Sequence, residues 1–132
     1  MNRYKNLEIW KDAIKLAKAV HVLTESLPKE ETYGLKSQLR RAAVSVASNI
    51  AEGAGRNTNG EFHQFLGIAI GSAFEVDTQL TIGVELGYFK ADPVKELSLR
   101  IDSLANRVNK LQQTLTPGKP RRELVRPATI DQ

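Results

Sequence analysis

Cysteine is absent from the 132-residue sequence, and only two residues are histidine. Without cysteine the chain has neither a disulfide nor a thiolate metal site, and it carries no cysteine nucleophile. His21 and His63 are too few for a histidine-rich metal site. Glu61 precedes His63 by two residues, whereas di-iron bundles use Glu-x-x-His pairs. These absences predict a protein without a metal or another cofactor.

Long hydrophobic runs are missing as well. No apolar run approaches the roughly 18 residues that a membrane span needs, and no apolar signal-peptide core follows the polar residues 1–5. The sequence has no P-loop, no GxGxxG and no HExxH motif, and no nucleophile elbow surrounds Ser45. We therefore expect a cytoplasmic protein that is not an enzyme and has no membrane segment.

Helical periodicity runs through most of the sequence, with apolar residues recurring every three or four positions. The predicted helices cover about residues 7–26, 35–52, 61–84 and 92–115. Short connections between long helices favour antiparallel neighbours, and no segment has the period-two alternation of a strand. The sequence therefore predicts an all-α fold, an antiparallel up-down four-helix bundle over residues 1–116.

Several residues mark where these helices begin and end. Thr58 and Glu61 have the S/T-x-x-E spacing of a capping box. Asp92, an acid followed by a proline, predicts a capped start for the last helix. Gly53 and Gly55 are predicted to end the second helix, because glycine readily adopts the positive φ found at helix ends.

Three features lie inside the predicted helices. Leu104 is in the middle of a strict four-three apolar row, so we expect it to be buried. A second apolar row runs beside the main one in the first helix: Trp10, Ile14, Ala17 and His21. Glycines within the third helix favour a close approach by another helix: Gly67, Gly71 and Gly83.

Residues 117–132 have no helical period and contain three of the five prolines. Their charged residues are Lys119, Arg121, Arg122 and Arg126 against Glu123 and Asp131. This composition predicts a basic C-terminal tail that is disordered or loosely docked on the bundle.

Charge is unevenly distributed along the chain, whose formal net charge is +4. Residues 1–57 carry ten basic residues against six acids, a net of +4, whereas residues 58–91 carry one lysine against four acids, a net of −3. Such asymmetry directs an electric field toward a partner, or lets the basic face of one subunit meet the acidic face of another.

Basic side chains in the first two predicted helices are the candidate nucleic-acid-binding residues. Lys11, Lys15 and Lys18 have the i, i+4, i+7 spacing that places them on one helix face. The other candidates are Lys36, Arg40, Arg41 and Arg56. These residues form either a solvated bundle surface or a surface that contacts phosphates and releases counterions. No aromatic residues are interleaved with them, which argues against stacking on bases.

A polar stripe follows the second predicted helix and includes Ser45, Asn49 and Glu52. One interpretation is a solvated face. The other is that Asn49 and Glu52 turn inward and tie the end of this helix to its neighbours, in which case they need hydrogen-bonding partners.

Runs of residues in and around the second helix resemble a known family. They are Tyr33-Gly34-Leu35, Gln38-Leu39-Arg40-Arg41-Ala42-Ala43-Val44-Ser45, Ser48-Asn49-Ile50-Ala51-Glu52-Gly53 and Gly55-Arg56. Further likeness lies in Trp10-Lys11-Asp12-Ala13 and Leu27-Pro28-Lys29-Glu30-Glu31. Over about residues 4–115 the chain resembles the 23S rRNA intervening-sequence protein family. That family typically has a proline where this sequence has Val46-Ala47, so no proline kink is expected.

The resemblance implies a four-helix bundle that assembles into a homopentamer and has no catalytic residues. It also implies a relation to accessory bundles of diversity-generating retroelements, which bind reverse transcriptase and RNA through a basic surface. Two functions remain open for this chain. It is either an assembly protein that binds RNA or a ribonucleoprotein, or an oligomeric protein-binding scaffold with no nucleic-acid role.

Overall fold

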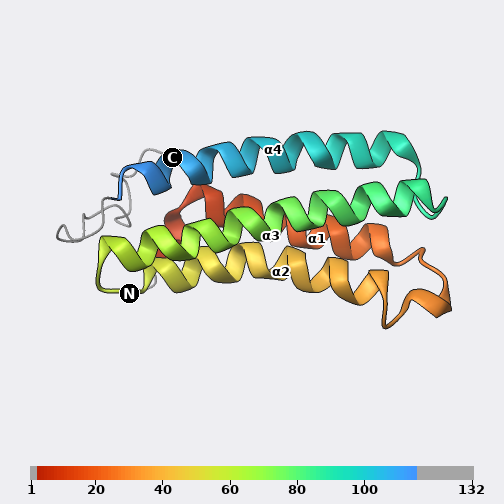
Figure 1. Cartoon of the computed structure of the whole chain (residues 1–132), viewed down its shortest axis with the longest axis horizontal. Helices are drawn as coiled ribbons and strands as arrows, with labels where there is room; N and C mark the ends of the chain where they lie inside the picture. The colour runs from red at the N-terminus through yellow and green to blue at the C-terminus, as the bar shows by residue number, and fades with distance from the viewer. Residues whose placement is uncertain (1–2, 116–132) are drawn as a thin grey trace.

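A computed structural model describes residues 3–115, which form four α-helices joined by short connections (Figure 1). The helices are α1 (Glu8–Thr24), α2 (Leu35–Ala54), α3 (Asn59–Glu85) and α4 (Ala91–Gln113). Short 3-10 turns lie before α1 and between α1 and α2: η1 (Arg3–Asn6) and η2 (Lys29–Glu31). These residues contain no strand. The predicted all-α four-helix bundle is confirmed, and the predicted tail at 117–132 lies outside the described residues.

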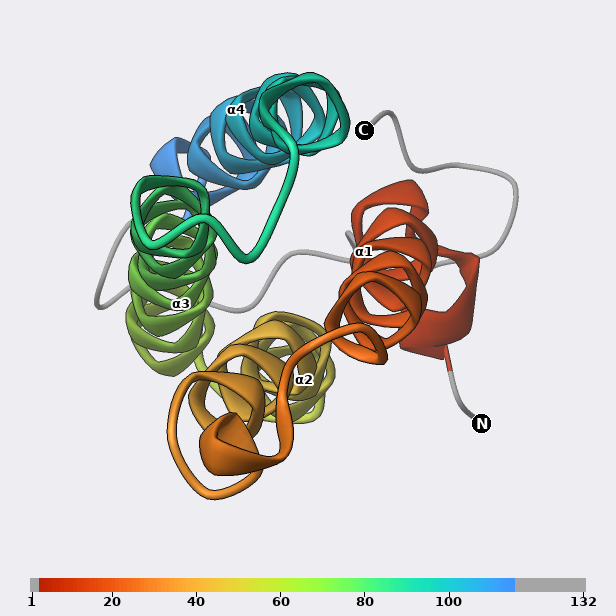
Figure 2. The ribbon, with the colours of Figure 1, turned by 90° about the vertical axis from the view of Figure 1, so that its right-hand side faces the viewer.

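The four helices surround one hydrophobic core (Figure 2). Each contributes the apolar row that its periodicity predicts, including Leu16 from α1, Leu39 from α2 and Leu66 from α3. Leu104 of α4 is only 2% exposed, as expected. Each helix packs on the next along the chain, and the α1–α4 seam, which closes the square, is the loosest of the four. None of the described helices has both the length and the apolar content to cross a membrane.

The predicted capping box forms at the start of α3. Thr58 is the N-cap, and its Oγ accepts a hydrogen bond from the Glu61 backbone N–H at 3.1 Å. The prediction for the start of α4 is wrong. Lys90 is the N-cap there, no side chain caps the helix, and Asp92 lies inside the first turn. An acid in the first turn still interacts favourably with the helix dipole without any capping hydrogen bond.

Glycines end the helices differently from the prediction. α2 continues through Gly53 to Ala54, and its C-cap Gly55 has a φ of −83°, so neither residue supplies a positive φ. Gly87, with a φ of 80°, follows the end of α3. Its N–H donates to Val84 O, and the next N–H, of Tyr88, donates to Gly83 O at 2.8 Å. This pair of bonds is a Schellman motif, which turns the chain toward α4.

Glycine inside α3 makes room for a loop side chain more than for a helix. A Cβ at Gly83 would overlap the ring of Phe89, which packs there from the α3–α4 connection. A Cβ at Gly67 would lie 3.1 Å from Gln112 Nε2 of α4. Gly71 has nothing within 4 Å of that position, so no close approach within the described part of the chain explains it.

Candidate nucleic-acid interface

The three lysines of α1 lie on one outward face, as their spacing predicts. Lys15 and Lys18 are exposed, and the Lys11 side chain is 48% exposed. Lys11 Nζ lies 3.1 Å from Glu8 Oε2 on the same helix. At a rise of 1.5 Å per residue the row extends roughly 10 Å along the axis. It therefore offers a short line of positive charge.

Helix α4 supplies further cations opposite this row. A hollow of about 360 Å³ between α1 and α4 is lined by Asp12, Lys15, Leu16, Arg100, Ser103, Leu104 and Arg107. A second hollow of about 430 Å³ continues along the same seam, and its lining includes Lys15, Lys18, Val22, Glu96, Leu97 and Arg100. Because Lys15 and Arg100 line both, the two hollows form one groove, which we call the basic groove.

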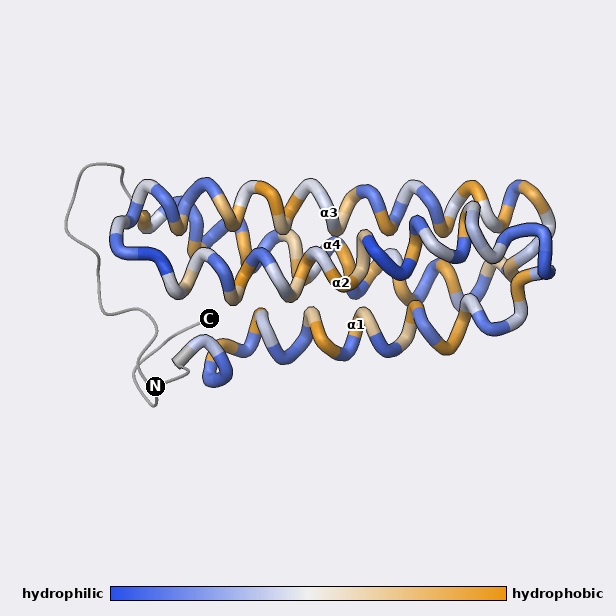
Figure 3. The backbone as a smooth tube through the Cα atoms, turned by 90° about the horizontal axis from the view of Figure 1, so that it is seen from below, coloured by the Kyte–Doolittle hydropathy of each residue, from blue (hydrophilic) through white to orange (hydrophobic). Residues whose placement is uncertain are grey.

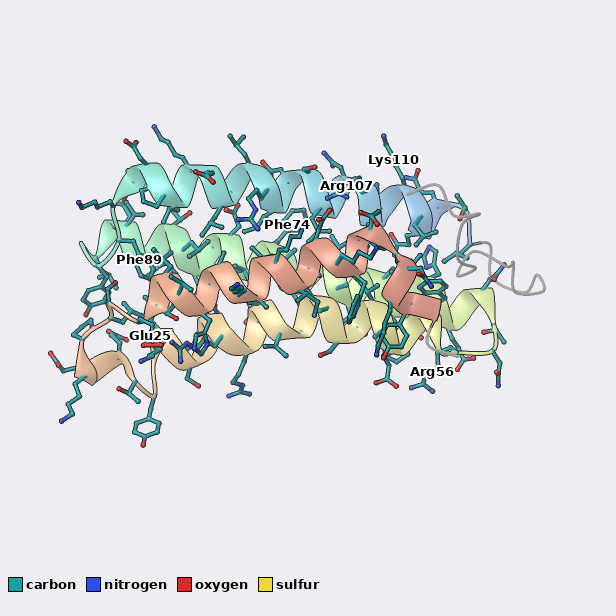
Figure 4. The ribbon with its side chains drawn as sticks, turned by 180° about the vertical axis from the view of Figure 1, so that it is seen from behind. Glu25, Arg56, Phe74, Phe89, Arg107 and Lys110 are labelled. Atoms are coloured by element: carbon teal, nitrogen blue, oxygen red, sulfur yellow. The ribbon has the colours of Figure 1, made fainter. Side chains whose placement is uncertain are left out.

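Three cations of the basic groove are free of ion pairs within the described residues: Lys15, Lys18 and Arg100. Arg107 differs, because its Nη1 lies 2.7 Å from Asp12 Oδ2 and links α4 to α1 (Figure 4). Both partners are half-buried, so this ion pair is better shielded from water than the surface pairs. It fixes one end of the groove, while the other cations stay available to an anion.

Arg40, a predicted binding residue, lies in the α1–α2 seam. Its Nε donates to Thr24 Oγ1 at 2.9 Å, and its Nη2 donates to His21 O at 3.1 Å. The same Nη2 lies 3.3 Å from Glu25 Oε1. Carbonyl groups in the last turn of a helix have no partner within that helix. The guanidinium therefore satisfies the C-terminal end of α1 and is engaged inside the bundle.

The remaining predicted cations do not share a surface with the lysine row. Arg56 Nη2 lies 3.3 Å from Glu52 Oε2, and its guanidinium carbon lies 4.8 Å above the Phe65 ring. It sits at the opposite end of the bundle from Glu25, the partner of Arg40 (Figure 4). Arg41 lines a polar depression between α2 and α3. Lys36 lies in the first turn of α2 and is partly exposed.

The polar stripe of α2 divides between the two interpretations. Ser45 Oγ lies 2.8 Å from Ser72 Oγ of α3, and Asn49 Nδ2 donates to Ser45 O at 2.8 Å. These two residues link helices, as the inward interpretation requires. Glu52 instead points outward, with a side chain that is 56% exposed and paired with Arg56. The expectation of an inward Glu52 is wrong, because it lies one turn from a cation that holds it at the surface.

One titrating group has a clear environmental effect. Tyr88 Oη donates to Glu31 Oε2 at 3.0 Å, joining the α3–α4 connection to the turn before α2. This hydrogen bond to Glu31 raises the pKa of Tyr88, with smaller contributions from burial and from the negative charges of Glu31 and Glu30. Within residues 3–115, no three His, Cys, Asp or Glu residues cluster as metal ligands would. The described site thus offers charge and hydrogen bonds.

The analysis of helix faces missed the α4 cations. Arg100 and Arg107 are seven residues apart, which places them on one face of α4. That spacing is a usable signal. What it cannot supply is the neighbouring helix, since only the closing of the bundle brings this face beside Lys15 and Lys18.

Comparison with known proteins gives one family and one structural relative. Residues 5–110 match the family described as 23S rRNA-intervening sequence protein. The fold is similar to a crystal structure of a protein with unknown function from the S23 ribosomal protein family of Bacteroides thetaiotaomicron VPI-5482. The TM-score is 0.72 at 15% identity, over 80% of this chain and 98% of that one. No curated protein matches the sequence.

Proposed function

Since the chain belongs to the 23S rRNA-intervening sequence protein family, we propose that it is a non-enzymatic assembly protein that binds RNA, free or within a ribonucleoprotein, through the basic groove. The observation that supports this is the convergence of Lys15, Lys18 and Arg100 from two helices on one groove. Within the described residues none of the three has an acidic partner. A line of phosphates provides the negative charge that such a groove lacks.

The groove favours contact with the RNA backbone over contact with bases. None of the described residues that line it is aromatic, so it offers no platform on which a base can stack. Lysine and arginine bind phosphates through charge and hydrogen bonds, and binding releases counterions. The affinity should therefore depend strongly on salt and weakly on base sequence.

Self-assembly is part of the proposal, with a homopentamer as the expected form. It is supported by exposed apolar side chains on three helices, among them Ile14, Val44 and Ile82. The same observation favours the second candidate function, a protein-binding scaffold in the cytoplasm with no nucleic-acid role. In that case a protein partner, such as a reverse transcriptase, covers apolar surface and the basic groove is a solvated face.

A salt series with matched variants separates the two functions. The test variant is Lys15→Gln/Lys18→Gln/Arg100→Gln, and the control is Lys29→Gln/Lys90→Gln/Lys95→Gln, which removes the same charge from exposed positions outside the groove. Fluorescence anisotropy with unrelated structured RNAs is measured at several salt concentrations. We expect the test variant to flatten the plot of log affinity against log salt by about 2, since each lost single-strand phosphate contact removes about 0.7.

The control variant should retain most of that slope, and all three proteins should melt at similar temperatures because the substituted side chains are exposed. The scaffold function predicts another result. Wild-type protein then binds RNA negligibly near physiological salt, or both triple variants bind it equally well.

A further inference from the structure

A second hollow, on another side of the molecule, has no charged lining. It measures about 250 Å³, lies between α1 and α2, and is lined by Tyr4, Trp10, Ile14, Ala17, Val44, Ala47, Ser48 and Ala51. Ile14 is 45% exposed and Val44 is 55% exposed. We call this feature the α1–α2 hollow. Its chemistry suits an apolar occupant and excludes an anion.

The α1–α2 hollow results from a mismatch in side-chain size. The second apolar row of α1 contributes Trp10 and Ile14, whereas α2 faces it with the small residues Ala47 and Ala51. Tyr4 packs edge-on against Trp10, with ring centroids 5.4 Å apart. Large side chains facing small ones leave a depression that the subunit itself does not fill.

Helix α3 carries the complementary shape on its outer side. Ile68, Ile82 and Leu86 are 46%, 44% and 58% exposed. With Glu75 they have spacings of seven, seven and four residues, which places all four on one helix face. We call this row the α3 ridge. Single exposed apolar residues are common on proteins, but a row of three opposite a vacant apolar hollow requires an explanation.

Charge complements shape on the two surfaces. α3 contains no lysine or arginine. Glu75 lies in the middle of the ridge, and Glu85 follows Ile82 by three residues. Beside the hollow the charges are positive, because Lys11 precedes Ile14 by three residues and Arg41 precedes Val44 by three. An apolar row with acidic neighbours thus fits an apolar hollow with basic neighbours, and opposite charges at a rim set orientation and partner choice.

The two surfaces face different directions. Seen with α2 toward the viewer, α1 and α3 lie on opposite sides of it (Figure 3). One subunit therefore cannot fill its own hollow with its own ridge. We infer that copies of this chain join head to tail, the α3 ridge of one copy filling the α1–α2 hollow of the next. Such a heterologous contact repeats from copy to copy and closes into a ring when the rotation allows. The inference rests on the proposed self-assembly and names its surfaces.

Charge placed on either surface tests the contact. The ridge variant is Ile68→Glu/Ile82→Glu and the hollow variant is Ile14→Glu/Val44→Glu. The control is Tyr33→Glu/Leu99→Glu, which adds the same charge at positions 95% and 71% exposed. The substituted side chains are all at least 44% exposed, so folding should survive, as circular dichroism and melting will show. By light scattering at micromolar concentration we expect wild type and control to be multimers and both test variants to have the 14.6 kDa monomer mass.

Mixing the two monomeric variants gives the sharper result. The ridge variant keeps an intact hollow and the hollow variant keeps an intact ridge, so the mixture should form a complex with one copy of each and grow no further. A symmetric contact of hollow with hollow, or ridge with ridge, leaves one variant fully assembled by itself. That outcome, or a mixture that stays monomeric, overturns the inference.

The control outcomes separate this inference from the proposed function. Wild-type protein at monomer mass overturns self-assembly and the inference together. Multimeric wild type with both test variants still multimeric overturns the inference alone. RNA binding is read independently, because none of the four residues substituted in the test variants lines the basic groove.

Discussion

Gly53 lets α2 pack directly against α3. A Cβ at this position would lie 2.7 Å from Phe65 Cβ and 2.9 Å from Phe62 Cδ1. Phe62 is fully buried, so its ring has little room to move. We predict that Gly53→Ala lowers the free energy of unfolding by about 1–3 kcal/mol, the usual effect of overpacking a core. Urea denaturation measures it.

The matched control for this prediction is Gly55→Ala. The nearest atoms to a Cβ there are backbone oxygens at 3.6 and 3.7 Å, and the φ of −83° suits alanine. A change within about 0.5 kcal/mol is expected. Equal effects of the two substitutions would show that helix propensity decides both, and that the α2–α3 contact does not.

Tyr88 makes stability depend on alkaline pH. Its hydroxyl bonds to the Glu31 carboxylate, and a phenolate beside that carboxylate is repelled, so the pKa of Tyr88 is raised above 10 in the folded chain. A pKa that folding raises contributes stability that is complete below the unfolded pKa and is lost as pH rises through the folded pKa. We predict that wild type loses stability between neutral pH and pH about 11 more steeply than Tyr88→Phe.

Tyr33→Phe serves as the control, because Tyr33 is 95% exposed. Its melting temperature should follow the wild-type pH dependence. If Tyr88→Phe also follows it, the loops at this end of the bundle are not joined by the Tyr88–Glu31 hydrogen bond in solution.

At the scale of the helix, Arg40 acts on the end of α1. Its guanidinium donates to the buried Thr24 hydroxyl and to His21 O. We predict that Arg40→Gln lowers the free energy of unfolding by about 1–3 kcal/mol, the range for hydrogen bonds to charged groups and for acceptors left unsatisfied. Arg41→Gln changes a neighbouring, exposed residue and should have an effect within about 0.5 kcal/mol. Chemical denaturation of both variants that gave equal losses would contradict the capping role of Arg40.

Periodicity determined the helices well and their ends less well. The apolar rows of all four helices are buried as predicted, because burial of one face is what a 3.6-residue period encodes. The start of α4 was misplaced because Asp92 is equally suited to an N-cap and to a first turn. Gly53 was misread as a terminator, since a glycine required by a neighbouring ring looks the same in sequence.

The candidate site was predictable only in part, for a related reason. The lysine row of α1 follows from spacing on one helix. The basic groove needs α4 beside α1, and that pairing depends on the closing of the bundle. Arg40 was counted as a surface cation because its contacts with Thr24 and His21 join residues 16 and 19 positions apart.

At the scale of the whole molecule, the acidic third quarter of the sequence does not form one acidic face. Glu61 is engaged by Thr58 at the start of α3, and Asp77 accepts a hydrogen bond from Ser98 of α4 at 2.7 Å. Glu75 and Glu85 are the exposed members, and Glu75 belongs to the α3 ridge. Complementarity between subunits therefore lies in a mixed apolar and acidic row, so salt should weaken assembly less than it weakens binding to RNA.

Assembly and RNA binding together make affinity depend on RNA length. Each copy offers one basic groove with few cations, which is a weak site, but a ring presents several grooves to one molecule. Binding at the second groove is then intramolecular, and the affinity rises wherever one RNA spans both sites. We predict that the multimeric wild type binds a long RNA about 100-fold or more tightly than a short one that covers a single groove, the lower range of such avidity gains.

The ridge variant Ile68→Glu/Ile82→Glu should bind the short RNA as wild type does, since its groove is untouched. It should lose most of the preference for the long RNA, because a monomer has no second groove to offer. Anisotropy titrations with both RNAs at one fixed salt concentration measure the two ratios. If the monomeric variant keeps the full length preference, several sites on one subunit bind the RNA, and the predicted Arg41 and Arg56, which lie outside the groove, become the next residues to substitute.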